Sequence, residues 1–129
     1  MQKRWAEKIG FADGYVMVTP EYNHGPSAVL KNAVDYLFAE WGRKPVAFAS
    51  FGGFGGTRAV EQLRQIRVEL RMASLAEAVH LTDFQAKVSE AGFAGDERDL
   101  GQAEAMFKSL VWWTRALKEA RLELGSASV

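Results

Sequence analysis

Short apolar runs alternate along the chain with longer segments in which apolar residues recur at helical spacing. The runs at residues 15–18, 46–51 and 78–81 are rich in strand-forming residues, which predicts strands buried on both faces of a parallel sheet. Helical segments precede, separate and follow these runs. The alternation predicts an α/β fold with helices packed on the faces of the sheet.

Four helices are expected around these strands. Residues 1–9 are typical of the end of a helix, with Gly10 placed as its C-cap glycine. The second helix begins near Ser27, directly after a proline, and ends at Gly42. Thr57 is the expected N-cap of the third helix, whose apolar stripe comprises Ala59, Leu63, Ile66 and Leu70.

The last third of the chain predicts a long exposed loop followed by the fourth helix. Residues 83–99 are polar and carry several charges, which is typical of such a loop. Trp112 and Trp113 fit core or interface aromatics better than a stacking platform. Residues 125–129 are expected to be a frayed tail. The helix is expected at residues 100–122, with a buried side of Ala103, Met106, Phe107, Leu110, Val111, Thr114 and Leu117.

The composition is that of an ordinary globular domain and narrows the classes of partner. The chain has 129 residues, which suits one domain over residues 1–129, and 48% of them are hydrophobic. Sixteen basic and sixteen acidic residues cancel, so no net field favours nucleic acid or an anionic membrane. Cysteine is absent, which excludes disulfides and thiolate catalysis. No apolar run approaches the roughly 20 residues of a membrane span, and a cytoplasmic protein is expected.

Two unusual loops follow the first two predicted strands. Residues 20–26 combine turn formers, an aromatic ring and a carboxylate, and residues 50–56 contain four glycines, which let the backbone approach a ligand closely. Ligands of open α/β sheets bind at the carboxyl ends of the strands, and adjacent parallel strands would bring these loops together in one cleft. Each loop alone is also compatible with an ordinary turn between strand and helix.

The common motifs of catalytic and metal sites are missing from the sequence. The glycines fit neither G-x-G-x-x-G nor the P-loop pattern. His24 and His80 lack metal-ligand spacing, so no metal site is expected. Ser27 and Ser50 have no convincing His or Asp partner in the sequence, which leaves a hydrolase triad without support. The arginines within residues 58–71 are interpreted as a solvated helix face.

The two loops and the helices after them resemble the NADPH-dependent FMN reductase family, which includes quinone, chromate and azo-dye reductases. Residues 19–25 with residues 30–35, and then residues 52–64, carry the resemblance in the order and spacing of the family. The resemblance implies a three-layer flavodoxin-like open parallel sheet and non-covalent FMN. It also implies a homodimer or homotetramer that passes electrons from NAD(P)H through FMN to quinone-like or other small acceptors.

The resemblance also assigns residues to the cofactor and implies no catalytic acid or base, because the flavin carries the redox chemistry. Backbone groups of residues 20–23 would contact the edge of the isoalloxazine ring, and residues 50–53 would lie under or beside it. The expected cofactor-binding residues are Pro20, Glu21, Tyr22, Asn23, Ser50, Phe51, Gly52 and Gly53.

The resemblance begins partway through the family's fold. The family's first strand, its FMN phosphate loop and its second strand have no counterpart here, so only the strands equivalent to three, four and five are expected. The first of these would then be an edge strand with unpaired backbone groups, which invites association. The alternative hypothesis is an N-terminally truncated, non-catalytic flavodoxin-like remnant that acts only through self-association.

Overall fold

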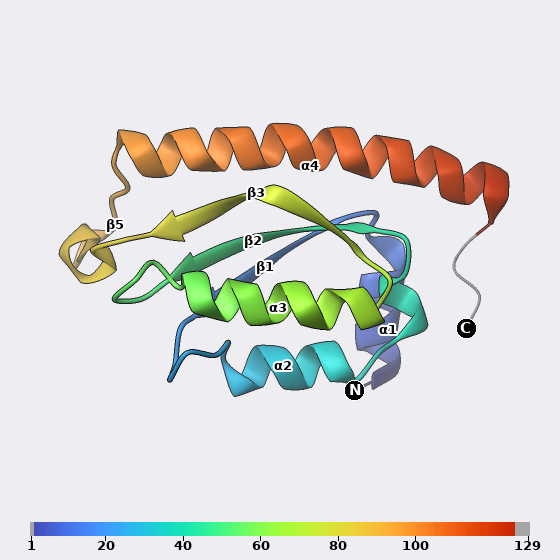
Figure 1. The fold of residues 1–129 in the computed structure, drawn as a ribbon, viewed down its shortest axis with the longest axis horizontal. Helices are drawn as coiled ribbons and strands as arrows, with labels where there is room; N and C mark the ends of the chain where they lie inside the picture. Colours follow the sequence, from blue (N-terminus) through green and yellow to red (C-terminus); the bar gives the residue numbers. More distant parts are fainter. Residues whose placement is uncertain (1, 126–129) are drawn as a thin grey trace.

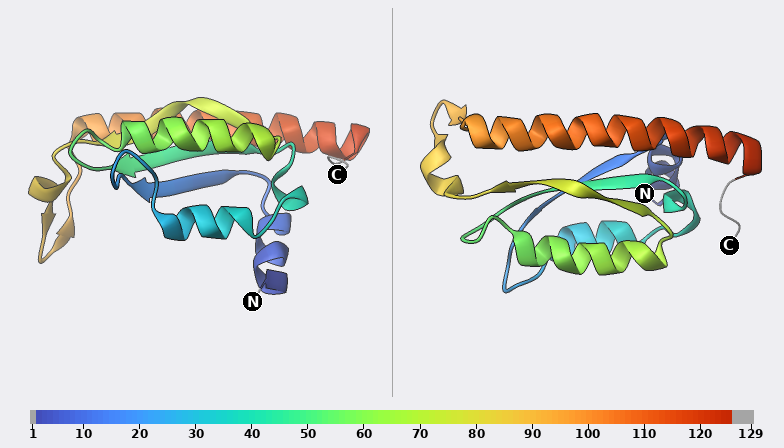
Figure 2. Two further views of the ribbon diagram at one scale, coloured as in Figure 1. Left: turned by 60° about the horizontal axis from the view of Figure 1, so that its bottom comes forward. Right: turned by 45° about the horizontal axis from the view of Figure 1, so that its top comes forward.

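A computed structural model describes residues 2–125 and shows a sheet between two helical layers (Figure 1). On one face lie α2 and α3, with α1 near the amino ends of the strands, and α4 lies across the other face (Figure 2). This arrangement confirms the expected α/β architecture. The elements are α1 (Gln2–Phe11), β1 (Tyr15–Pro20), α2 (Ala28–Asp35), the 3-10 helix η1 (Ala39–Trp41), β2 (Pro45–Phe51), α3 (Thr57–Glu69), β3 (Ala73–Leu81), the 3-10 helix η2 (Phe84–Lys87), β4 (Val88–Ser89), β5 (Gly92–Phe93) and α4 (Glu97–Leu124).

The main sheet has the order β1-β2-β3, and all its pairings are parallel. Val46, Ala47 and Phe48 of the central strand are fully buried, because a helical layer covers each face of the sheet. Within residues 2–125, β1 and β3 each pair with one strand only. The first strand is therefore an edge strand, as the resemblance implied.

Alternate residues of β2 enter two separate cores, as the two-residue period of a strand requires. Phe48 packs with Val34 and Leu63 in the core beneath α2 and α3. Ala47 packs with Met106 in the core beneath α4, together with Leu75, Val79 and Leu110. The second core is smaller, so α4 is held to the sheet by fewer buried side chains.

Two helix boundaries differ from those predicted. The first helix continues through Gly10 to Phe11, so Gly10 is not its C-cap. The second helix ends at Asp35 instead of Gly42, and the chain reaches Trp41 through the 3-10 turn η1. Trp41 still enters the core, because its Nε1 donates to the Val34 carbonyl at 3.1 Å.

Two further boundaries are corrected around α3. Gly56 is its N-cap, with a φ of 74°, so Thr57 is the first helical residue and not the cap. The third strand begins at Ala73 and not at residue 78, because Ala73 pairs with Pro45 at the start of the sheet. The early part of this strand does not show as an apolar run in the sequence, because β3 is an edge strand with polar and partly exposed side chains.

The predicted loop at residues 83–99 contains more structure than its polarity indicated. It forms η2, the short hairpin of β4 and β5, and the first turn of α4. Asp96 caps α4 by accepting from the Asp99 amide at 3.0 Å, and the Asp99 side chain accepts from the Asp96 amide in return. The expected start of the helix at residue 100 was late, since α4 begins three residues upstream at Glu97, directly after the capping residue Asp96.

The outward surface of α4 is more apolar than predicted. Phe107 and Val111, expected on the buried side, are 53% and 50% exposed. They face solvent because α4 contacts β3 and β2 through a narrower stripe that includes Met106 and Leu110. Trp112 is also exposed, so it is not a core residue of this chain. Within residues 2–125, no helix is long and apolar enough to cross a membrane.

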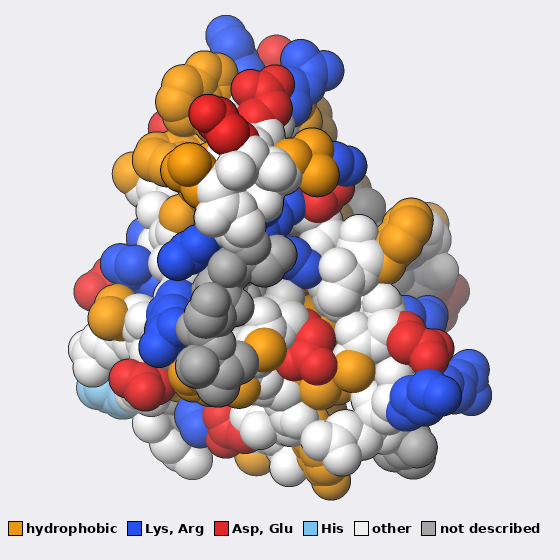
Figure 3. All heavy atoms as spheres, turned by 90° about the vertical axis from the view of Figure 1, so that its right-hand side faces the viewer, with side chains coloured by type: hydrophobic (Ala, Val, Ile, Leu, Met, Phe, Trp, Pro, Cys, Tyr) orange, Lys and Arg blue, Asp and Glu red, His pale blue; other side chains and the backbone are white. Residues whose placement is uncertain are grey.

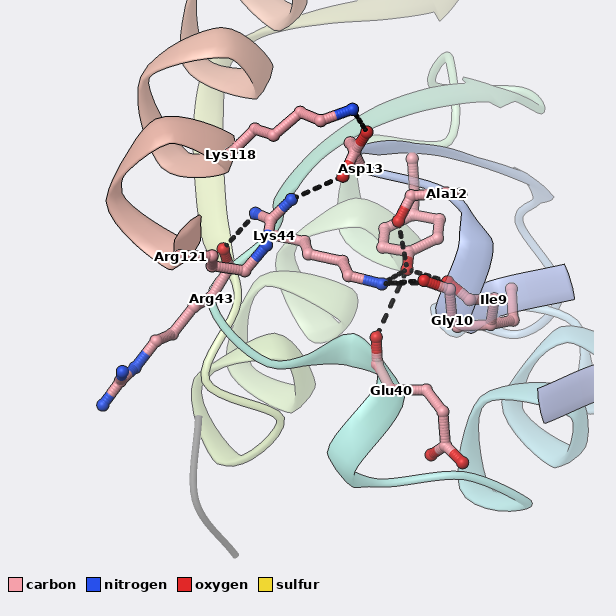
Figure 4. Close-up of polar contacts among 10 residues, drawn as sticks. Ile9, Gly10, Ala12, Asp13, Glu40, Arg43, Lys44, Lys118 and Arg121 are labelled. Atoms are coloured by element: carbon pink, nitrogen blue, oxygen red, sulfur yellow. Dashed lines mark hydrogen bonds and ion pairs between the residues drawn. The ribbon is translucent and has the colours of Figure 1, made fainter. Parts of the chain in front are cut away.

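A polar network at the amino ends of the strands ties α1, β1 and α4 together (Figure 4). The Lys44 ammonium donates to the carbonyls of Ile9 and Gly10 at 3.0 and 3.1 Å. Asp13 accepts from Lys118 at 2.6 Å and from Arg121 at 2.7 Å. These bonds satisfy the last carbonyls of α1 and anchor the far end of α4.

Figure 3 shows this end of the molecule, where basic and acidic side chains intermingle and hydrophobic ones gather along α4 at the top. Neither sign of charge dominates the face. Of the tail expected at residues 125–129, only Gly125 lies within the described residues, as the C-cap of α4. Residues 126–129 lie outside them.

Candidate functional site

The two predicted loops meet where β1 and β2 end, on the left of Figure 1. Thr19 pairs with Ser50 and Pro20 with Phe51, so the two strands end level. The Glu21 amide then donates to the Phe51 carbonyl at 3.0 Å and extends the pairing by one residue. The loops therefore leave the sheet side by side, as their places after adjacent parallel strands predicted.

A hollow of about 600 Å³ opens between the two loops, a volume within the range of small-molecule sites. The third wall is the segment that follows β3. The lining contains no Lys or Arg side chain. The lining residues are Pro20, Glu21, Tyr22, Phe51, Gly52, Gly53, Asp83, Phe84, Gln85 and Ala86.

Six of the eight residues expected to contact a cofactor line this hollow. Asn23 does not line it and lies in the turn beyond Tyr22, and Ser50 is fully buried beneath the loop. Sequence reasoning missed the wall at residues 83–86, because it read the whole segment as an exposed loop. The sequence feature that could have indicated this wall is Phe84, an aromatic residue only three positions after the third strand.

The first loop is shaped by its own hydrogen bonds. The buried Thr19 hydroxyl donates to the Pro20 carbonyl at 2.7 Å and accepts from the Ser27 amide at 3.2 Å. Tyr22 and Gly25 exchange two backbone bonds of 2.9 and 3.0 Å around a two-residue turn. Both turn residues have positive φ, the requirement of a type I′ turn. The backbone of the loop is thus fixed before any ligand binds.

Glu21 fastens the first loop to the start of α3. Its carboxylate, only 4% exposed, accepts from the Arg58 guanidinium and from the Arg58 amide at 3.1 Å. Burial raises the pKa of Glu21, but the hydrogen bonds and the charge of Arg58 outweigh it, so this pKa lies below its ordinary value. Arg58 also donates to His24 at 2.9 Å and lies over the ring of Phe54. The interpretation of this arginine as part of a solvated helix face was therefore wrong.

The buried side chain of Ser50 holds the two ends of the second loop together. The Ser50 hydroxyl donates to the Gly55 carbonyl at 2.7 Å and lies 2.8 Å from His80 Nδ1. Gly56 has to be glycine, because its φ is 74° and an added Cβ would lie 2.6 Å from the Ser50 Cβ. The histidine partner of Ser50, absent from the sequence interpretation, comes from the neighbouring strand β3. Since this serine is fully buried, the pair shapes the loop and offers no exposed nucleophile.

Aromatic side chains form the wall after β3. The rings of Phe51 and Phe84 stack with centroids 4.4 Å apart, and Phe93 stacks on Phe84 at 5.8 Å. Lys87 holds this segment to α4 by bonds of 2.7 Å to Asp99 and 2.9 Å to Asp96. Those bonds raise the pKa of Lys87 above its ordinary value. The wall therefore presents the ring of Phe84 beside the polar Asp83 and Gln85, and the Lys87 ion pairs hold it to the start of α4.

The arrangement suits a flat, largely uncharged ring. Glycine and proline backbone borders the hollow on two sides, and stacked phenylalanines border it on the third. The amides of Gly52 and Gly53 donate no hydrogen bond within the described part of the chain, so they remain available to a ligand. Residues 2–125 contain no group of three His, Cys, Asp or Glu side chains that could hold a metal ion.

Comparison with known proteins finds NAD(P)H-dependent FMN reductases. The sequence model of the NADPH-dependent FMN reductase family matches residues 1–86. An NAD(P)H-dependent FMN reductase of Schizosaccharomyces pombe is 49% identical over 70 residues, which are 54% of this chain and 35% of the relative. One of a Nectria species is 40% identical over 109 residues, which are 80% of this chain and 54% of that relative. The chain thus spans between about a third and about half of the length of these two relatives.

A solved structure supports the fold. The flavoenzyme NAD(P)H:acceptor oxidoreductase FerB of Paracoccus denitrificans superposes with a TM-score of 0.66 at 21% identity, covering 92% of this chain and 68% of FerB. Together with the three-stranded parallel sheet, this similarity establishes a flavodoxin-like fold. The family match includes both loops of the hollow and extends into the wall after β3. The chain belongs to the NADPH-dependent FMN reductase family.

Proposed function

We propose that the chain carries the ring-binding half of an NAD(P)H-dependent FMN reductase that delivers electrons to quinone-like or other small acceptors. The observation that carries the proposal is that both loops of the family resemblance line one hollow. The family match and the relatives that are FMN reductases support the choice of FMN and NAD(P)H. No catalytic acid or base is required of the protein.

Each wall of the hollow has a distinct part in this proposal. Backbone groups of Pro20, Glu21 and Tyr22 would hold one edge of the ring, and the amides of Gly52 and Gly53 would donate to its polar atoms. Asn23 and Ser50 act from behind these contacts, through the turn and through the loop closure described above. FMN held there would supply the redox chemistry, by which NAD(P)H, a proton and a quinone would give NAD(P)⁺ and the hydroquinone.

This hollow offers no basic side chain to bind the phosphate of FMN. Asp83 adds a carboxylate to its lining, whereas the Glu21 carboxylate is paired with Arg58. The chain should therefore recognise the ring and not the phosphate. We expect the Kd values of FMN and riboflavin to agree within about threefold, or roughly 0.7 kcal/mol. An FMN affinity more than tenfold above that of riboflavin would reveal a phosphate site elsewhere on the chain.

The proposal extends to assembly and location. We expect a homodimer or homotetramer in the cytoplasm. The edge strand β1 and the exposed apolar side chains of α4 support self-association, because such surfaces are usually covered in stable proteins. The absence of cysteine is compatible with a reducing compartment.

Turnover tests the proposed reaction. With oxygen excluded, the purified chain incubated with FMN should oxidise NADPH or NADH in repeated turnovers only when a soluble quinone is supplied, and the flavin absorbance should shift on binding. A chain that neither changes the spectrum of added FMN nor accelerates NAD(P)H oxidation would contradict the reductase assignment. It would favour the alternative in which the domain acts through self-association alone.

A further inference from the structure

The side chains that line the hollow leave it with one uncompensated negative charge. Glu21 and Asp83 are the charged residues of the lining. The charge of Glu21 is balanced by Arg58, whose guanidinium it binds. Within the described part of the chain, the Asp83 side chain makes no hydrogen bond and no ion pair. The charge of Asp83 therefore acts on whatever enters the hollow.

The next charged group along the same wall does not cancel this charge. Lys87, at the end of η2, binds two carboxylates, Asp99 at 2.7 Å and Asp96 at 2.9 Å. One ammonium with two carboxylates leaves a further negative charge at the start of α4. The segment that follows β3 is thus acidic from its first residue to the helix that it joins.

The backbone at Asp83 sets its carboxylate beside an aromatic ring. Asp83 has a φ of 52°, in the left-handed region that aspartate and asparagine tolerate, and its carbonyl accepts from the Ala86 amide at 2.9 Å. The next residue, Phe84, also lines the hollow and stacks on Phe51 with centroids 4.4 Å apart. The face of an aromatic ring attracts cations, as a carboxylate does. Two neighbouring groups of this wall therefore favour positive charge.

We propose that the wall after β3 selects electron acceptors by charge, with Asp83 as the specificity-determining residue. The hollow takes flat aromatic acceptors that are neutral or positively charged, such as quinones and dyes with a quaternary ammonium group. It disfavours anionic acceptors, such as chromate and sulfonated quinones or azo dyes. For turnover, the inference rests on the function proposed above; for binding of a flat ring, it rests on the hollow alone.

The binding test uses the purified chain without flavin or NAD(P)H. The probes are 10-methylacridinium and acridine-9-carboxylate, which have the same ring system and opposite charges, and NMR shifts of the Gly52 and Gly53 amides report that the hollow is occupied. The wild type should bind the cation at least about threefold more tightly, and this preference should shrink between about 20 mM and about 500 mM salt, because salt screens the charge. Tighter binding of the carboxylate, or no shift of either amide with either probe, would overturn the proposal.

One substitution tests whether Asp83 causes the preference. Asp83→Asn removes the charge and keeps the shape of the side chain, and asparagine also tolerates the left-handed backbone. The ratio of the two Kd values should change roughly threefold or more in favour of the anion. Glu104→Gln is the matched control, because it removes an exposed carboxylate of α4 outside the hollow, and it should keep the wild-type ratio. A ratio that is unchanged in Asp83→Asn, or that changes equally in both variants, contradicts the role of Asp83.

Turnover of two charged quinones tests the choice of acceptor. With oxygen excluded, FMN added and NADPH saturating, NADPH and one proton should reduce a naphthoquinone with a trimethylammonium or a sulfonate group to its hydroquinone. The two quinones differ in reactivity, so the informative quantity is the ratio of their kcat/KM values, which should fall roughly threefold for cation over anion in Asp83→Asn. A chain that reduces neither quinone contradicts the proposed function, while the binding ratio still decides the charge preference. Turnover with the same ratio in the wild type and in Asp83→Asn contradicts the inference alone.

Discussion

Glu21 shows how one residue in the hollow can serve the fold and the ligand at once. Glu21 lines the hollow, while its carboxylate, only 4% exposed, binds Arg58. Ser50 does not line the hollow, but its side chain also holds backbone in place, because it bonds the Gly55 carbonyl of the glycine loop. In both residues the side chain fixes the backbone of a loop that lines the hollow.

Glu21→Gln should destabilise the protein by about 1–3 kcal/mol, because a buried charge-assisted pair is lost and Arg58 keeps its charge. Since the pKa of Glu21 is lowered on folding, its contribution is present above the ordinary pKa of a glutamate and is lost as the pH falls through the lowered value. Urea unfolding at several pH values measures both effects. Glu61→Gln is the control, because Glu61 is 73% exposed, and it should change stability by less than about 0.5 kcal/mol. Equal losses of unfolding free energy in the two variants would show that the Glu21–Arg58 pair stabilises the protein no more than an exposed carboxylate does.

At the scale of elements, α4 is anchored at its two ends by charge and in its middle by a few apolar side chains. The capping box and Lys87 fix its first turn, and Asp13 holds Lys118 and Arg121 near its last turns. The hydrogen bond and charge of Lys118, with those of Arg121, lower the pKa of Asp13. We therefore expect that removing the contacts at one end of α4 loosens that end and leaves the other docked.

Asp13→Ala should release the end of α4 and cost about 1–2 kcal/mol, because two charged partners lose their acceptor. Hydrogen exchange should quicken at residues 117–124 and stay unchanged at residues 97–106. Asp35→Ala removes an exposed i,i+4 pair with Lys31 and should cost no more than about 0.5 kcal/mol. Uniform loss of protection along α4 in Asp13→Ala would contradict an end-anchored helix.

The sequence predicted the order of elements because apolar periodicity reports burial, and burial is nearly complete in β2. It failed where long-range pairing decided the structure. The early part of β3 is a strand only because Ala73 meets Pro45, and Phe107 is exposed only because α4 docks through a narrow stripe. Likewise, no local pattern could reveal that His80 on β3 reaches Ser50 on β2. The two loops were predictable because both immediately follow buried strands.

At the scale of the whole molecule, the sheet is uncovered along one border. Val18 on β1 is 59% exposed, although it pairs with Ala49, which packs against the core beneath α4. The apolar side chains Phe107 and Val111 are exposed on α4 itself. A surface of this kind favours association with further protein.

Val18→Lys should shift the wild-type assembly toward smaller species in sedimentation velocity, because a charge on this face opposes its burial. Folding should be retained, since Val18 is outside both cores of residues 2–125. Val68→Lys on α3 is a matched control, because Val68 is also 59% exposed, and it should leave the assembly unchanged. An assembly that is equally sensitive to both changes would place the contact elsewhere.

Whether the flavin ring lies between the two loops can be decided by filling the hollow. Gly53 lines it, and a Cβ added there meets no atom within 4 Å, so Gly53→Leu should fold normally and occupy the space of the ring. Gly101→Leu on α4 adds the same side chain at an equally open position outside the hollow. In a titration followed by flavin fluorescence, the wild type and Gly101→Leu should bind FMN with the same Kd, and Gly53→Leu should bind at least about tenfold more weakly. Binding to Gly53→Leu with the wild-type Kd would contradict a flavin site between the two loops.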